Sequence, residues 1–177
     1  PDAVTYVCVL KACAIVKALH IGEQIHNEVR KRGLLRNDVI LGTALVDMYS
    51  KCNALQKAQN VFEKLPVQTL ASWNALLAGY TEQGNIEEAM RCFRCMELER
   101  IVVDEITLVY ALKLCSITRD VEKGREIHID IEKKGYLEGE VFIGNALVDM
   151  YAKCGSFTNA VNLFEKLPIR DKVSWTS

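Results

Sequence analysis

The chain repeats itself after 102 residues, and this periodicity constrains its fold more than any other feature of the sequence. When residues 1–75 are aligned with residues 103–177, 32 of the 75 positions are identical. The string ALVDMY, for example, occurs at 44–49 and again at 146–151. Units of this size stack on their neighbours, because one unit alone cannot bury its apolar face. We therefore expect a repeat protein.

Each period divides into three unequal units of 36, 31 and 35 residues. The recurring pairs Leu41-Gly42 and Ser72-Trp73 set their phase. The predicted units are a long unit at 3–38, a short unit at 39–69, a standard unit at 70–104, a second long unit at 105–140, a second short unit at 141–171, and the start of a truncated standard unit at 172–177.

Two helices are predicted in each unit. In the standard unit, one apolar stripe at helical spacing contains Trp73, Leu76, Leu77 and Tyr80. Gly84 interrupts this stripe before a second one begins, and no stretch shows sustained strand alternation. The expected fold class is all-α: a right-handed α-solenoid superhelix of helix-turn-helix repeats, formed by a single array.

Composition narrows the classes of function. The chain is 50% apolar and 25% charged with a net charge of −1, which excludes wholesale disorder and a sequence-blind polyanion binder. No apolar run approaches the length of a membrane span, so no membrane partner is expected. Seven cysteines without a paired framework indicate a reducing compartment. Cys92-x-x-Cys95 lacks a second pair, and no nucleophile-base set or phosphate loop occurs, so we expect no enzyme, metal or cofactor.

The strings VLKAC, GEQIH, ALVDMYSKC, VFEKLP and SWNALLAGY, at the unit lengths above, resemble pentatricopeptide repeat proteins over the whole chain. More narrowly, they resemble the plant subclass that cycles long, short and standard repeats. Tetratricopeptide repeats keep a regular 34-residue period and fit poorly. The resemblance implies binding of single-stranded RNA, one nucleotide per repeat, by the first helix of each unit. It also implies a mitochondrial or chloroplast RNA-editing or RNA-processing specificity factor, working with editing-factor proteins.

Within this family, the fifth and last residues of a repeat read the base, and the second residue packs against it. The fifth and last places are occupied by Val7 and Asp38, Thr43 and Thr69, Asn74 and Asp104, Val109 and Glu140, and Asn145 and Asp171, with Thr176 at the fifth place of the truncated unit. The second places are occupied by Val4, Ile40, Ala71, Ile106, Phe142 and Val173.

The chemistry of these pairs predicts a base preference. An Asn amide offers both a donor and an acceptor to a pyrimidine edge, and Asp offers acceptors only. The two Asn/Asp pairs resemble the uracil-preferring combination of the family. Thr43 resembles a purine reader, although Thr69 replaces the usual acidic or amide partner. Val7 and Val109 have no polar group with which to read a base. The predicted core is U-any-U.

Four lysines are predicted to lie on the same helix face as the second places and are candidates for phosphate contact: Lys11, Lys51, Lys113 and Lys153. In the alternative, Lys51 pairs with Asp47 and Lys153 with Asp149, four residues earlier on the same helix.

A solenoid of this shape could instead hold a peptide or a partner helix. RNA binding weakens with salt and varies with the base, whereas peptide binding need do neither. Asn74 and Asn145 could likewise be helix caps or bond to the local backbone. His26 and His128 are expected to be packed or surface-satisfied imidazoles and not ligands, and Trp73 is expected to pack between helices. The terminal repeats expose apolar faces that could drive self-association.

Overall fold

The computed structural model describes residues 1–36, 38–137 and 141–167, and these contain ten α-helices and no β-strand. Each repeat contains two helices, and we call the one at its start the first helix and the other the second helix. The first helices are α1 (Ala3–Val16), α3 (Val39–Lys51), α5 (Leu70–Glu82), α7 (Glu105–Thr118) and α9 (Val141–Lys153). The second helices are α2 (Leu19–Lys31), α4 (Leu55–Phe62), α6 (Ile86–Leu98), α8 (Val121–Lys133) and α10 (Phe157–Lys166), and a 3-10 turn, η1 (Leu34–Arg36), follows α2. The all-α class is confirmed.

Each first helix ends in the same hydrogen-bonded turn. In α5, the N–H of Asn85 donates to the carbonyl of Tyr80 at 2.9 Å, while Gly84 adopts a left-handed φ of 75°. This six-to-one bond satisfies a carbonyl that would otherwise be left at the helix end. Bonds of the same span close the other first helices: Ala18 to Cys13, Ala54 to Tyr49, Asp120 to Cys115 and Ser156 to Tyr151. The turn therefore recurs at one place in every hairpin.

A glycine lets each long unit's second helix approach the next first helix closely. Met48 of α3 is fully buried, and a Cβ built at Gly22 of α2 would collide with its thioether. Gly124 of α8 and the fully buried Met150 of α9 repeat this arrangement. Any larger residue at these two positions would push the helices apart.

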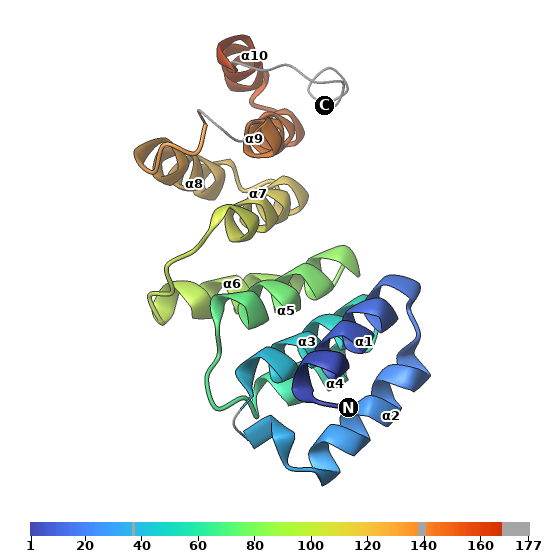
Figure 1. Ribbon diagram of the computed structural model, residues 1–177. Helices are drawn as coiled ribbons and strands as arrows, with labels where there is room; N and C mark the ends of the chain where they lie inside the picture. The colour runs from blue at the N-terminus through green and yellow to red at the C-terminus, as the bar shows by residue number, and fades with distance from the viewer. Residues whose placement is uncertain (37, 138–140, 168–177) are drawn as a thin grey trace. The chain divides into compact units, whose positions relative to one another are not determined.

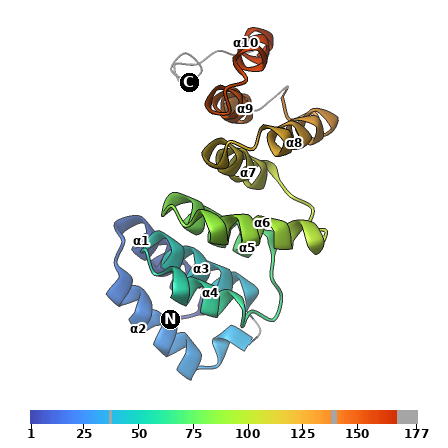
Figure 2. The same cartoon turned by 180° about the vertical axis from the view of Figure 1, so that it is seen from behind.

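The helices pack into two compact units that each contain more than one repeat. We call them the first unit, Pro1–Val102, and the second unit, which begins at Val103. In the first unit, α1 packs on α3 and α3 packs on α5, while α2 and α4 each contact the first helices before and after them (Figures 1 and 2). In the second unit, α7 packs on α9, and α8 contacts both. First helices thus form one layer and second helices another within each unit. None of the helices in the described ranges has the length and apolar character needed to cross a membrane.

Candidate nucleic-acid interface

Apolar side chains are exposed at the same place in every first helix. Val4 and Ile40, at the second places of their units, have 70% and 71% of their surface exposed. Ile106 and Phe142 are 52% and 44% exposed, and Ala71 is also exposed. Water contact of an apolar side chain costs about 25 cal/mol per Å². A ligand with a flat apolar face would remove this cost at one site per repeat.

The fifth-place residues lie on the same face, three positions further along each helix. Val7, Thr43 and Val109 are half-buried, whereas Asn74 and Asn145 are each only 9% exposed. Each of these two residues has a further interaction within the protein. The N-cap of α5 is Thr69, so Asn74 lies inside the helix, and the interpretation of this residue as a cap is wrong. The two Asn side chains are thus held in the fold beside the exposed second places.

The last-place residues are N-caps of the next first helix. The backbone N–H of Leu41 donates to Asp38 Oδ1 at 2.9 Å, and that of Ser72 donates to Thr69 Oγ1 at 3.3 Å. Asp104 Oδ1 accepts both the backbone N–H of Thr107 at 2.9 Å and its hydroxyl at 2.8 Å. Capping satisfies helix N–H groups that have no partner within the helix. It also fixes each last-place side chain at the start of the helix that carries the next exposed second-place residue.

Asp2 is a further residue of this kind that the sequence analysis missed. It caps α1 and accepts the N–H of Thr5 at 2.8 Å and its hydroxyl at 2.7 Å. The hydrogen bond from the Thr5 hydroxyl lowers the pKa of the Asp2 carboxyl most, and the one from the Thr5 N–H lowers it further. The 102-residue shift aligns Asp2 with Asp104, so the sequence contained the signal. Asp2 occupies the last place of the unit that would precede Ala3.

The lysines at the thirteenth place form ion pairs within their own helices. Lys51 Nζ lies 2.9 Å from a carboxylate oxygen of Asp47, and Lys153 Nζ lies 2.8 Å from Asp149 Oδ2. Both lysine side chains remain more than half exposed, at 52% and 60%. Such pairs contribute only about 0.3–0.5 kcal/mol each. The lysines at the ninth place, Lys11 and Lys113, are exposed as well.

Three other candidate residues, His26, His128 and Trp73, contact side chains of neighbouring helices. His26 Nδ1 lies 2.9 Å from the Tyr49 hydroxyl, and His128 Nδ1 lies 2.9 Å from the Tyr151 hydroxyl. Trp73 is buried, with its ring edge-to-face against Phe62 at a centroid distance of 4.6 Å. In the described ranges, no three His, Cys, Asp or Glu residues are placed to hold a metal ion.

Four predicted site residues lie outside the described residues: Glu140, Asp171, Val173 and Thr176. The remaining second, fifth and last places gather at the N-terminal ends of the first helices. In the first unit, where α1, α3 and α5 lie side by side, this gives a row that starts with Val4 and continues with Ile40 and Ala71. In the second unit, Ile106 and Phe142 lie on the adjacent helices α7 and α9. Packed helix axes are about 8–10 Å apart, which sets the spacing between successive apolar contacts.

Comparison with known proteins agrees with this architecture. A family model described as "PPR repeat" matches residues 71–101 and 145–170. A pentatricopeptide repeat-containing protein of Arabidopsis thaliana that is designated chloroplastic is 37% identical over 177 residues, which cover 100% of this chain and 28% of that relative. A second one, designated mitochondrial, is 40% identical over 169 residues, covering 96% of this chain and 16% of the relative. The chain thus spans less than a third of the length of either protein.

Solved structures show the same fold. The crystal structure of the pentatricopeptide repeat protein PPR10 from maize matches 99% of this chain and 26% of its own, with a TM-score of 0.64 at 20% identity. PPR10 in complex with an 18-nucleotide psaJ RNA element matches 94% of this chain and 25% of its own, with a TM-score of 0.68 at 21% identity. The α-solenoid fold is thereby confirmed. Residues 71–101 and 145–170 thus match the pentatricopeptide repeat model, and the chain is similar along its length to proteins that contain this repeat.

Proposed function

We propose that this chain binds single-stranded RNA selectively, with one repeat for each base. The observation that carries the proposal is the exposed apolar side chain at the second place of every first helix, each accompanied by a fifth-place residue on the same face. A nucleobase offers two apolar faces for packing and a polar edge for hydrogen bonding. The complex of maize PPR10 with RNA gives a precedent for this ligand on the same fold.

Base selection rests on the fifth and last places together. The side chain of Asn74 is an amide with a donor and an acceptor, and that of Asp104 is a carboxylate that only accepts hydrogen bonds. This pair suits the edge of uracil, and the pair of Asn145 with Asp171 repeats it. Thr43 leans towards a purine. The valines at the fifth places select no base, so the preferred core is U-any-U.

Long-range electrostatic attraction contributes little to the binding of RNA, because the chain has a net charge of only −1. The half-exposed ammonium groups of Lys51 and Lys153, with Lys11 and Lys113, would contact phosphates between successive bases. Each phosphate contact adds salt dependence but no base selectivity. Selectivity therefore comes from the fifth and last places.

The wider role is that of a specificity factor for RNA editing or RNA processing in an organelle. The alternation of 36, 31 and 35 residues supports assignment to the subclass with long, short and standard repeats. Relatives designated chloroplastic and mitochondrial support an organellar location. In this role the chain recognises RNA and carries out no reaction itself.

Fluorescence anisotropy at low salt tests this proposal. A short unstructured RNA with U-any-U is compared with one in which purines replace both uracils, using the native chain and the N74V/N145V variant. Asn162 is an exposed asparagine on α10, a second helix, so N162V is the matched control. We expect a preference for the uracil RNA that the double variant loses and N162V keeps. Equal binding of both RNAs, unaffected by salt, would contradict base reading and favour a protein-binding solenoid.

A further inference from the structure

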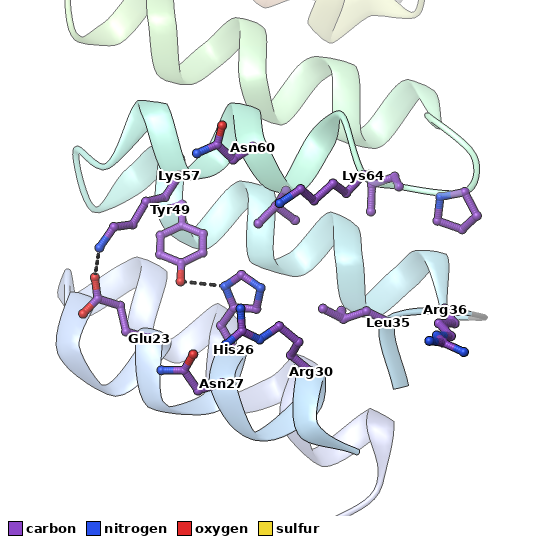
Figure 3. Close-up of a pocket in the computed structure, with 13 residues that line it drawn as sticks. Glu23, His26, Asn27, Arg30, Leu35, Arg36, Tyr49, Lys57, Asn60 and Lys64 are labelled. Atoms are coloured by element: carbon purple, nitrogen blue, oxygen red, sulfur yellow. Dashed lines mark hydrogen bonds and ion pairs between the residues drawn. The ribbon is translucent and has the colours of Figure 1, made fainter. Parts of the chain in front are cut away.

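A basic pocket of about 730 Å³ lies on the other side of the first unit from the base-packing residues. Its walls are α2 and α4, with η1 at one end and Tyr49 of α3 at its base (Figure 3). Tyr49 follows Thr43 by six residues, which turns it about 120° around α3 from the fifth place. The pocket is therefore separate from the proposed base-reading surface.

The lining carries a local excess of positive charge. Arg30 and Arg36 approach from α2 and η1, and Lys57 and Lys64 approach from the opposite wall, whereas Glu23 is the one acidic residue of the lining (Figure 3). Glu23 forms an ion pair with Lys57. Among the residues that the structure describes, Arg30, Arg36 and Lys64 form no ion pair. Three cations thus face one pocket in a chain whose net charge is −1.

The His26 imidazole in this pocket lies in the electrostatic field of these cations. Burial lowers the pKa of His26, and the charges of Arg30, Lys64 and Lys57 lower it further. The ring is held by Tyr49, whose hydroxyl lies 2.9 Å from Nδ1. Because the imidazole at the base is neutral, the positive charge of the pocket comes from the cations at its rim. A ligand that enters the pocket can contact these cations.

The internal repeat shows that the fold does not require these charges. In the second unit, His128 and Tyr151 keep the same 2.9 Å contact. The residue equivalent to Arg30 is Glu132, which lies 3.6 Å from His128 Nε2. Burial lowers the pKa of His128, and the charge of Glu132 opposes this shift. In the aligned sequence Asn159 corresponds to Lys57 and Glu138 to Arg36, while Arg125 corresponds to Glu23 and Lys166 to Lys64. The packing of His on Tyr is thus repeated without the excess of positive charge.

We propose that the pocket binds the phosphate of a nucleotide-sized ligand. Guanidinium groups match the geometry of phosphate oxygens. The lining contains two of them, Arg30 and Arg36, and the Lys64 ammonium. Asn27 and Asn60 add amide donors and acceptors on the two walls. The volume lies within the range of about 300–1,000 Å³ typical of small-ligand sites. The phosphate would come from a free nucleotide or from the 5′ end of an RNA.

Calorimetric titration at low salt with inorganic pyrophosphate and with AMP tests the proposal. R30E introduces the residue that the second unit carries at the equivalent position, and K64Q removes a second cation. The matched control is K31E, since Lys31 is exposed in the same last turn of α2 but does not line the pocket. We expect R30E and K64Q each to weaken binding of both probes at least tenfold and K31E to change it less than twofold. Far-UV circular dichroism verifies that all three variants are folded.

Two further arms distinguish the source and the class of ligand. A short RNA with a 5′ phosphate, compared with the same RNA with a 5′ hydroxyl, binds more tightly through Arg30 if the phosphate is that of an RNA end. Tighter binding of AMP than of either RNA assigns a free nucleotide. Absence of pyrophosphate and AMP binding, or equal losses in R30E and K31E, would overturn the proposal. Tighter binding of tetraglutamate than of pyrophosphate, lost in R30E, would also overturn it and assign the pocket to an acidic peptide.

Discussion

The Asp104 carboxylate caps α7, and we propose that it also reads a base together with Asn74. Substitutions can separate these two roles. D104A removes the acceptor of the Thr107 N–H and of its hydroxyl, both within 2.9 Å. D104N keeps a side-chain oxygen in the capping position, since Asn is as good an N-cap as Asp. The amide nevertheless replaces a group that only accepts hydrogen bonds by one that also donates them.

The magnitude follows from these contacts. Loss of an N-cap costs about 1 kcal/mol, and the buried Thr107 hydroxyl loses its hydrogen bond to Asp104 at a cost of about 1 kcal/mol more. We therefore expect D104A to lower the free energy of unfolding by about 2 kcal/mol, or the melting temperature by about 4–8 °C. D104N should cost less than about 0.5 kcal/mol. D38A, which loses the cap bond from the Leu41 N–H, should cost about 1 kcal/mol.

Urea denaturation followed by far-UV circular dichroism measures the stabilities, and anisotropy with the U-any-U RNA measures binding. The expected pattern is that D104N keeps its stability and loses the preference for uracil opposite Asn74. A D104N variant as unstable as D104A would refute the capping argument. A D104N variant that is stable and still prefers uracil would refute the role of Asp104 in base reading.

Three further predictions concern packing, pH and charge. G22A and G124A should each destabilise the fold by about 1–3 kcal/mol in denaturation experiments, because a Cβ collides with Met48 or Met150, whereas N27A on the exposed face of α2 should be nearly neutral. Burial lowers the folded-state pKa of His26 and His128, so the unfolded chain binds protons more readily and stability should fall as the pH drops from about 7 to 5.5; an H26Q/H128Q variant with undiminished pH dependence would contradict this. K51Q/K153Q should change stability by less than about 1 kcal/mol and lower the slope of log affinity against log salt by about 1.4, and an unchanged slope would exclude phosphate contact by these lysines.

Helical hairpins and their phase could be predicted because the relevant signals are local. Apolar spacing defines the stripe that contains Trp73 and Leu77, and Gly84 marks the left-handed turn that ends α5. The pairing of Lys51 with Asp47 was foreseen as an alternative, since residues four apart are neighbours on any helix. These features depend on chain geometry that each unit carries within itself.

The capping role of the last places was missed, although its signal is also local. Asp38, Thr69 and Asp104 are typical N-cap residues that stand directly before a helix. Assigning them to the end of one unit directed attention to base reading and away from the helix that follows. The burial of Asn74, by contrast, depends on how neighbouring helices pack, and spacing within one helix does not determine it.

The basic pocket could not be predicted from the sequence. Its cations come from α2, η1 and α4, and charge spacing along the chain does not bring Arg30 and Lys64 to one cavity. Only the packing of both second helices around Tyr49 defines the site. An alignment of the chain with itself after 102 residues shows that Glu132 stands where the first copy has Arg30. The sequence does not show that Arg30 lines a pocket.

If each repeat reads its own base, a change of the fifth-place residue in one repeat should alter the base preference at one nucleotide only. N74T places in the standard unit the fifth-place residue that the preceding short unit carries at Thr43. Its affinity is measured for the four RNAs in which each uracil of U-any-U is kept or replaced by adenine. We expect the preference to change from uracil to purine at the nucleotide opposite residue 74 and to stay unchanged at the nucleotide opposite Asn145. A change at both nucleotides, or a uniform loss of affinity with no change of preference, would contradict reading by separate repeats.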